Sequence, residues 1–570
     1  MSQSNVTMPG KQSEAQATSY DFIVIGSGSA GGALTARLSE NGQHTVLCLE
    51  AGEKGSNYVW SRPPAAVGYM YENPAVNWCY HSEPNETIGG RSLYVPRGRM
   101  LGGTSSINGM IYNRGIALDY DTWAEQGCQG WSYKDVLPYF KKLEATEIGV
   151  DSLRGRDGPM KVTVCSKVSP FYDLFIRAAQ TAGVPHNDDY SGASQIGVAM
   201  AQQNVVRGRR ISTATQYLGP ARQRANVTIE SGAEATSLIL EGNRCVGVRY
   251  RRAGVLHEVR ARREVIVSCG AANSPKLLEL SGIGNPDILN RHGIEVRHAL
   301  HGVGENLRDH YGALMKWRLN TPGISIAKRG SGWRLGLEVL KYLFFGKGFI
   351  SQGMGTLRVF MPSRPGMKNP DIMMVVAPFM IELIPGVGRR MSRTDGFFMY
   401  SHPQRTESTG SVHIQSADPA VAPAIDFRFL QTETDRQTSI LAVKRAREIV
   451  QSQPLGPLIA EELQPGPAVQ TDDEILGFLR TQGLITNHMV GTCRMGRDDM
   501  AVVDERLRVR GMHGLRVADA SVMPTMPSGN TSIPCIMVGE KCADMVLADA
   551  REANVPGAGQ TERHKLPSYA

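Results

Sequence analysis

The chain has 570 residues, of which 41% are hydrophobic and 20% are charged, and its formal net charge is +8 at pH 7. This length exceeds what one simple hydrophobic core fills, so we expect at least two domains. The positive charge is modest for this size and forms no long basic run, which argues against nucleic-acid binding. Short basic stretches such as 207–210 and 249–252 are interpreted as solvated surface or anion contacts.

Nine cysteines are scattered from Cys48 to Cys542 without a CxxC pair. This pattern argues against a disulfide framework and against a metal site, and it predicts buried, reduced thiols in a cytoplasmic protein. No uninterrupted apolar stretch approaches 18 residues, and the polar start is not a secretory signal. We expect residues 1–18 to be a disordered arm and 551–570 a disordered tail.

The glycine-rich segment 26–31 follows an apolar run at 20–25 and precedes a helical stretch and a second apolar run at 44–49. Glu50 then stands nineteen residues after Gly31. This order of strand, glycine turn, helix, strand and acid predicts a dinucleotide site. The helix N-terminus offers N–H groups to phosphates, and Glu50 can accept hydrogen bonds from ribose hydroxyls. The carboxylate disfavours a 2′-phosphate, hence NADP, but the motif does not separate FAD from NAD.

Further along, 135–143 is expected to be a helix with Ser132 as N-cap. Short apolar runs at 227–229, 236–240 and 246–250 predict a β-meander, and 264–268 predicts a buried strand that enters a second glycine turn and a helix at 276–280. Between about 321 and 477 the runs at 371–376 and 410–414 suggest an antiparallel sheet, with a helix at 438–451. A strand at 514–519 then returns to the first domain.

The predicted fold is therefore α/β (α+β overall), with a Rossmann-like dinucleotide-binding domain and an inserted substrate domain built on an antiparallel sheet with helices. We assign residues 19–160, 205–315 and 480–550 to the first domain and 161–204 and 316–479 to the second.

Three separated segments agree on a family. Residues 98–108, 270–284 and 488–496, the last followed by 516–521 and 529–531, resemble the signatures of the glucose–methanol–choline (GMC) oxidoreductases, and the match extends over about 20–550. The branch it most resembles is that of bacterial choline and alcohol dehydrogenases. The resemblance implies FAD and the oxidation of a small alcohol by hydride transfer to flavin N5. Electrons would pass to a quinone or other carrier; the alternative is an oxidase that reduces O2 to peroxide.

Two further hypotheses stay open with less weight: a flavin-containing hydroxynitrile lyase and a non-enzymatic flavin protein. A choline pocket would need an aromatic cage and a carboxylate, and the sequence shows neither. The alcohol and the oligomeric state cannot be read from the sequence.

The resemblance also implies roles for individual residues. His488, in its HxxGTxxMG setting, is expected to be the catalytic base or the donor to the forming alkoxide, and Asn530 to orient the substrate oxygen. Some relatives link FAD covalently through a histidine at the position of Ile107, so we expect noncovalent FAD. The expected cofactor-binding residues are Gly26, Ser27, Gly28, Ser29, Ala30, Gly31, Glu50, Ala51, Arg99, Gly102, Gly103, Thr104, Asn108, Gly109, Met110, Ile111, Ala235, Asp519, Ala520, Asn530 and Thr531.

Two other features have competing interpretations. His310 lies in a segment that resembles a structural lid or hinge of the family, so we expect a structural role for it. The aromatic, basic segment 333–347 predicts a helix that faces the core of the substrate domain; the less favoured alternative is contact with a membrane surface, which would make the protein peripheral to the inner membrane.

Overall fold

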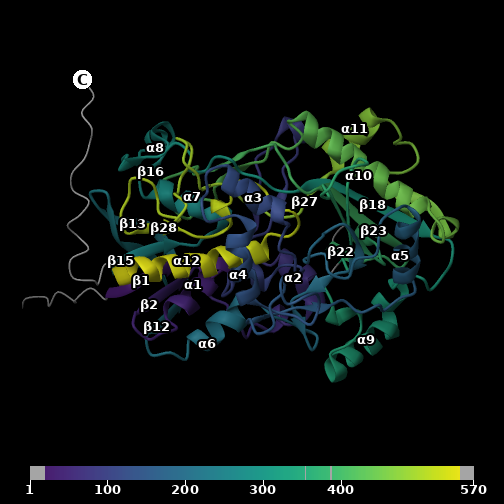
Figure 1. The fold of residues 1–570 in the computed structure, drawn as a ribbon, viewed down its shortest axis with the longest axis horizontal. Coiled ribbons are helices and arrows are strands. Elements are labelled where there is room, and N and C mark those ends of the chain that lie inside the picture. The colour runs from purple at the N-terminus through teal and green to yellow at the C-terminus, as the bar shows by residue number, and fades with distance from the viewer. Residues whose placement is uncertain (1–18, 354, 385–387, 553–570) are drawn as a thin grey trace, which may run out of the picture.

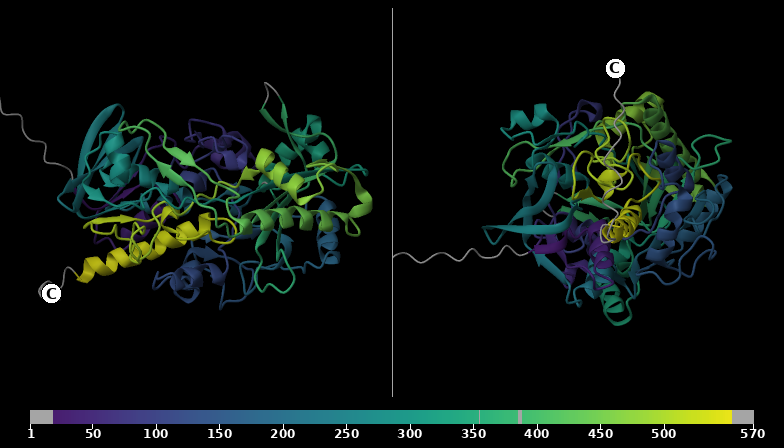
Figure 2. Two further views of the ribbon diagram at one scale, coloured as in Figure 1. Left: turned by 90° about the horizontal axis from the view of Figure 1, so that it is seen from above. Right: turned by 60° about the vertical axis from the view of Figure 1, so that its left-hand side comes forward.

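The computed structural model describes residues 19–552 apart from 354 and 385–387, so the expected arm and nearly all of the expected tail lie outside the described residues. Residues 551 and 552 are an exception, because they still belong to the last helix. The molecule is elongated, and each half is built around one large sheet (Figure 1). Figure 2 shows the long last helix running along the half that carries the first sheet.

The first sheet confirms the predicted Rossmann-like core. Its strands β12, β2, β1 and β15 are parallel, β28 adds in parallel to β15, and β14 and β13 continue from β15 as an antiparallel meander. The strand predicted at 264–268 is longer than expected, because its polar first half pairs with β14. In sheet order the strands are β12 (Val227–Ser231), β2 (Val46–Glu50), β1 (Ser19–Ile25), β15 (Val255–Val267), β14 (Arg244–Arg252) and β13 (Ala233–Glu241), with β28 (Leu515–Val517) beside β15.

The second sheet is antiparallel, as predicted for the inserted region. The run at 410–414 is not part of it; it forms β24 (Ser411–His413), which pairs only with β25 (Ala424–Asp426). In sheet order the strands are β26 (Ile459–Gln464), β18 (Tyr311–Leu319), β23 (Gly396–Pro403), β20 (Ile372–Ala377), β19 (Leu357–Met361) and β8 (Gly197–Met200), with β27 (Leu484–Ile485) beside β18.

Helices cover both sheets. Ser132 caps α4 as predicted, and its side chain and that of Asp135 form a reciprocal capping box. The longer helices of the first half are α1 (Ser29–Leu38), α3 (Ala117–Glu125), α4 (Tyr133–Leu143), α7 (Gly270–Leu280) and α12 (Ser532–Glu552). Those of the second half are α5 (Phe171–Thr181), α9 (Gly332–Phe345), α10 (Glu433–Gln451) and α11 (Asp472–Gln482).

Two glycines permit the close packing of α1. A Cβ on Gly31 would stand 1.9 Å from the carbonyl oxygen of Gly26, so a larger residue would push the helix away from the turn after β1. A Cβ on Gly539 would stand 2.5 Å from the carbonyl oxygen of Ala30, where α12 crosses α1. The glycine turn is therefore enclosed by the last helix of the fold as well as by β1.

The helix α9 is where the expectation from sequence was wrong. The predicted helix forms, but the only one of its residues that is buried is Glu338, which pairs with Arg329. Trp333 and Phe344 expose 71% and 76% of their surfaces. The helix projects from the lower side of the second half in Figure 1. Its apolar face is therefore not packed in the core of the substrate domain.

The nine cysteines are all free and most are buried, as expected from their spacing. Within the described part of the chain, no helix is both long and apolar enough to cross a membrane.

A buried ion-pair cluster joins α7 to β24. Nδ1 of His413 lies 2.7 Å from Glu279 and Nε2 lies 3.1 Å from Glu305. Burial alone would lower the pKa of His413, but the hydrogen bonds and charges of the two carboxylates raise it to about 9. Because this folded-state pKa is above the ordinary value, the cluster stabilises the fold fully below about pH 6.5, and the stabilisation is lost as the pH rises through about 9.

We therefore predict that His413→Gln lowers the thermal midpoint at pH 6 by an amount equivalent to about 2–3 kcal/mol, and that the gap from wild type narrows by pH 10. The control is His301→Gln, which replaces an exposed histidine that lies outside this ion-pair cluster. A gap of constant size across this pH range would contradict the assigned protonation.

Candidate active site

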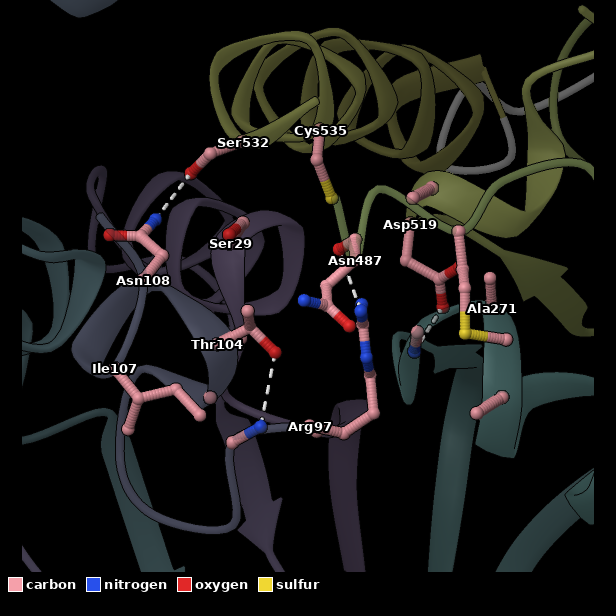
Figure 3. Close-up of a pocket in the computed structure, with 18 of the residues that line it drawn as sticks. Ser29, Arg97, Thr104, Ile107, Asn108, Ala271, Asn487, Asp519, Ser532 and Cys535 are labelled. Carbon is pink, nitrogen blue, oxygen red and sulfur yellow. Dashed lines mark hydrogen bonds between the residues drawn. The ribbon is translucent and has the colours of Figure 1, made fainter. Parts of the chain in front are cut away.

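A single elongated cavity of about 440 Å³ connects the glycine turn after β1 with the second sheet. Its walls come from the turn at 26–30, the segment 96–111, the start of α7, the strands β19, β20 and β23, and the segments 486–489 and 519–535. Figure 3 shows how segments distant in sequence converge there: Asn108 reaches toward Ser532 at the start of α12, and Arg97 toward Asn487.

Most of the residues predicted from the sequence line this one cavity. They are His488 and Asn530, and, among the expected cofactor-binding residues, Gly26, Gly28, Ser29, Ala30, Glu50, Ala51, Gly103, Thr104, Asn108, Gly109, Met110, Ile111, Ala235, Asp519, Ala520 and Thr531. Four expected residues do not line it, namely Ser27, Gly31, Arg99 and Gly102.

Three of these four support residues that do line the cavity. The Ser27 hydroxyl donates to Glu50 at 2.5 Å and accepts from the backbone N–H of Gly102 at 3.1 Å, so it fixes the carboxylate and ties two glycine turns together. The guanidinium of Arg99 lies over the ring of Trp78, 4.7 Å from its centre, and 3.7 Å from Glu234. Gly31 permits the close helix packing described above.

The dinucleotide end of the cavity fits an extended phosphate-bearing cofactor. A Cβ on Gly28 would meet nothing within 4 Å, so the first turn of α1 leaves open space beside its N–H groups. A Cβ on Gly103 would come within 2.9 Å of Gly28 Cα, so the second glycine segment closes directly over the first. Glu50 accepts from the N–H groups of Ser27 and Gly52 and still faces the cavity, which leaves its carboxylate available to ribose hydroxyls.

His488 stands at the other end, in a chain of hydrogen bonds. Its Nδ1 lies 3.0 Å from Nδ1 of His310 and 2.8 Å from the Thr486 hydroxyl, and its Nε2 lies 3.0 Å from the side-chain amide of Asn530. Nε2 of His310 lies 2.6 Å from the backbone carbonyl of Gln404.

This chain of hydrogen bonds determines which nitrogen of His488 carries the proton. The carbonyl of Gln404 can only accept, so Nε2 of His310 donates to it and Nδ1 of neutral His310 must accept. The nitrogen that donates to it is Nδ1 of His488. Nε2 of His488 is then free of a proton, and it faces the cavity and the amide N–H of Asn530. His488 is therefore presented as a base at Nε2.

Burial and charge keep both imidazoles neutral. Burial lowers the pKa of His310 well below its ordinary value, and the neighbouring His402 and His488 lower it further. Burial also lowers the pKa of His488 well below its ordinary value, with the positive charges of Arg97 and Arg358 adding to the effect. The lone pair on Nε2 of His488 accepts from the Asn530 amide, and a hydroxyl group that displaces this hydrogen bond can give its proton to the neutral imidazole.

Asp309 stands behind this pair. Its carboxylate accepts from the backbone N–H of His488 at 2.8 Å and from the Thr486 hydroxyl at 3.1 Å. Burial raises the pKa of Asp309 to about 6, although Arg97 opposes the shift. The carboxylate is thus ionised above about pH 6 and can stabilise positive charge on the imidazole beside it.

Several residues of this end escaped the sequence analysis. We expected His310 to belong to a lid or hinge, whereas it is fully buried against His488. Arg97, Arg358, Tyr400, Met373 and Asn487 also line the cavity. Two signals were present in the sequence: Arg97 stands next to the glycine segment 98–103, and Asn487 stands directly before His488. Arg358, Met373 and Tyr400 come from strands of the second sheet that carry no motif.

Comparisons with known proteins agree with this geometry. Profiles of the GMC oxidoreductase family match residues 20–312 and 406–539. Oxygen-dependent choline dehydrogenase of Brucella suis biovar 1 (strain 1330) is 41% identical over 531 residues, covering 92% of this chain and 95% of that protein. The protein of the same name from Rhizobium rhizogenes (strain K84 / ATCC BAA-868) is 40% identical over 94% of this chain and 96% of its own.

Solved structures give the same result. Pyridoxine 4-oxidase from Mesorbium loti superposes with a TM-score of 0.82 at 29% identity, covering 92% of this chain and 98% of that structure. A formate oxidase superposes with a TM-score of 0.86 at 25% identity, covering 94% and 99% of the two chains.

Proposed function

This chain belongs to the GMC oxidoreductase family and is an FAD-dependent enzyme that acts on the CH–OH group of its donor; we propose that His488 and Asn530 form its catalytic pair. The observation that carries the proposal is the hydrogen-bond chain that leaves Nε2 of His488 without a proton and beside the amide of Asn530. A substrate hydroxyl that replaces the 3.0 Å hydrogen bond between these two groups can give its proton to the imidazole and accept a hydrogen bond from the amide.

The other residues of the hydrogen-bond chain stabilise His488 after it has received the proton. Once protonated at Nε2, the imidazole still donates from Nδ1 to His310 and Thr486, so its ring keeps its orientation. Asp309 offsets the new positive charge through space and through Thr486. FAD, when bound, supplies the acceptor for the hydride that leaves the carbinol carbon. The residues proposed to hold FAD are those of the glycine turns and Glu50, with Ser27 and Gly102 supporting them.

The position expected for a covalent link carries Ile107, which lines the cavity and has no nucleophilic atom. FAD is therefore held noncovalently.

We also propose the division into a cofactor domain and a substrate domain along the two sheets. Because β18 begins at Tyr311, the boundary proposed near 315 is better set at 310.

For the electron acceptor we propose a quinone or another carrier, with O2 as the alternative. Relatives named oxygen-dependent choline dehydrogenase and structural neighbours named oxidases support both acceptors. Anaerobic reduction of the flavin by an alcohol, followed by reoxidation with either O2 or a quinone, separates them: fast peroxide formation in air identifies an oxidase.

We predict that His488→Ala lowers the rate of anaerobic flavin reduction by an alcohol about 10²–10⁴-fold, because the base at Nε2 is lost. The variant should keep its FAD spectrum. The surface control His301→Ala should reduce at the wild-type rate. Equal rates in His488→Ala and wild type would exclude His488 as the base, and a flavin that no alcohol bleaches would argue instead for the lyase.

We predict that kcat/KM falls on the acid side with an apparent pKa near 6, because protonation of Asp309 removes the negative charge behind His488. Protonation of His488 should not contribute to this decrease in kcat/KM near pH 6, since the pKa of His488 is well below its ordinary value. In Asp309→Asn the decrease should disappear and the rate should stay low across the range. A decrease that persists unchanged in this variant would assign it to another group.

For localisation we propose peripheral contact with an anionic membrane surface through α9. Its exposed face combines Trp333, Leu343, Phe344 and Phe345 with exposed basic residues that include Lys341. Apolar side chains that insert at the headgroup level beside lysines and arginines are typical of interfacial helices. Membrane contact would bring the enzyme to a pool of quinone.

We predict that the holoenzyme floats with vesicles containing anionic lipid and that the double variant Phe344→Ser, Phe345→Ser reduces the bound fraction by about tenfold, because two aromatic side chains no longer leave water. The control is Val255→Ser, Leu256→Ser, another exposed apolar pair, on the β14–β15 hairpin of the first sheet. Flotation that is unaffected by the first pair, or lost equally with the second, would exclude α9 as the contact.

A further inference from the structure

The substrate end of the cavity has a wall of three aligned side chains. Arg358 on β19 is paired in register with Val375 on β20, and Val375 is paired with Tyr400 on β23. Residues directly opposite one another on neighbouring strands point to the same face of a sheet. All three line the cavity that also contains His488. The second sheet therefore turns one arginine toward the catalytic end.

Arg358 is buried, and only some of its hydrogen-bond donors have partners. Only 2% of its surface is exposed, and its Nη1 donates to the carbonyls of Gly355 and Leu357 at 2.8 and 2.9 Å. Nε has no hydrogen-bond partner, and within the described residues Nη2 makes no hydrogen bond and the guanidinium forms no ion pair. A buried guanidinium without an anionic partner is costly, since taking a charge out of water is offset only by a paired charge and good hydrogen bonds.

A second arginine adds to the positive charge. Arg97 donates from Nη2 to the carbonyl of Asn487 at 2.6 Å, its Nε has no partner, and it forms no ion pair among the residues the structure describes. Figure 3 shows its side chain extending along the cavity to Asn487. Both guanidinium groups are close enough to His488 for their charges to lower its pKa.

The carboxylates that line the cavity already have hydrogen-bond or ion-pair partners away from the two arginines. Glu50 accepts from Ser27 and Gly52, Glu234 pairs with Arg99, and Asp519 accepts from the N–H of Gly270 and the hydroxyl of Ser274. Among the described residues, Asp309 is the one carboxylate that hydrogen-bonds to His488, and a single negative charge does not balance two guanidinium groups. The substrate end thus has an excess of positive charge.

We propose that the substrate is an alcohol that carries a carboxylate, and that Arg358 binds this carboxylate while His488 and Asn530 hold the hydroxyl. The proposal rests on the function proposed above and adds the chemical class of the substrate. Nη2 of the Arg358 guanidinium makes no hydrogen bond among the described residues, so its N–H groups can donate to a carboxylate oxygen; Nε also has no partner, but neighbouring atoms close it off from solvent. A quaternary ammonium such as choline meets two positive charges at this end instead of the carboxylate and aromatic cage that its recognition needs.

The competing interpretation is that Arg358 only clamps the turn before β19 through Nη1. A clamp would affect all substrates equally, whereas a carboxylate-binding residue would affect only the anionic ones. This difference defines the test.

The experiment uses the FAD holoenzyme with two matched pairs of alcohols, benzyl alcohol with 4-(hydroxymethyl)benzoate and 1-butanol with 4-hydroxybutyrate, and choline as the cation. Anaerobic flavin reduction gives kcat/KM for each. We expect the anionic member of at least one pair to exceed its neutral partner by about tenfold or more, and choline to be the poorest. Arg358→Met should lower kcat/KM for the anionic member about 10–150-fold, the range expected for a lost charge-assisted hydrogen bond, and leave the neutral member within a few-fold.

Two further measurements make the result decisive. Arg358→Lys, which restores the charge without the planar edge, should recover part of the anionic preference. Benzoate and butyrate, which carry no hydroxyl, should perturb the flavin spectrum of wild type on titration, with a Kd that rises at least tenfold in Arg358→Met and is unchanged in Val255→Ser.

The outcomes separate the two proposals. A loss that is equal for neutral and anionic alcohols, or a wild-type preference for neutral alcohols or choline, would overturn the carboxylate proposal and leave alcohol oxidation standing. If no alcohol reduces the flavin, the proposed catalytic pair fails, and the titration with benzoate and butyrate still decides whether Arg358 binds carboxylates.

Discussion

The hydrogen bond between Nδ1 of His310 and Nδ1 of His488 joins two segments that adjoin paired strands of the second sheet. His310 stands directly before β18 of the second sheet, and His488 follows β27, which pairs with that same strand. The backbones are joined there as well, since the N–H of Thr486 donates to the carbonyl of His310 at 3.1 Å. The catalytic end is thus held by strand pairing of the second sheet, so the protonation of His488 depends on the same backbone contacts that join β18 and β27.

The burial of His310 and His488 also determines how the two imidazoles share a hydrogen bond. Two neutral imidazoles in contact can share one hydrogen bond only if one donates and the other accepts, and the carbonyl of Gln404 decides which. The positive charges of Arg97 and Arg358 disfavour protonation of His488 before substrate arrives, while Asp309 favours it once a proton has been transferred. A base that stays free over a wide pH range and is compensated after it reacts suits the removal of a hydroxyl proton.

The two ends of the cavity are built on different physical grounds. At the cofactor end, glycines and the N-terminus of α1 bring backbone N–H groups close to a ligand, so backbone geometry provides the binding. At the substrate end, side chains from strands of the second sheet provide charge and shape. One architecture can therefore keep the cofactor end constant while side chains on the strands of the second sheet vary with the substrate.

The sequence by itself determined the first sheet, the glycine turns, the noncovalent nature of the cofactor and the identity of His488 and Asn530 as candidates. The first sheet and the glycine turns follow from local spacing, because a strand–glycine–helix turn is formed by consecutive residues, whereas noncovalent FAD and the candidates His488 and Asn530 follow from the resemblance to the family. Only the tertiary structure decided the rest. His310, Arg97 and Arg358 acquire their roles from neighbours more than a hundred residues away, and α9 proved exposed because nothing else in the described chain covers it. Periodicity records which residues share a face, but it does not record what that face meets, which depends on the packing of distant segments.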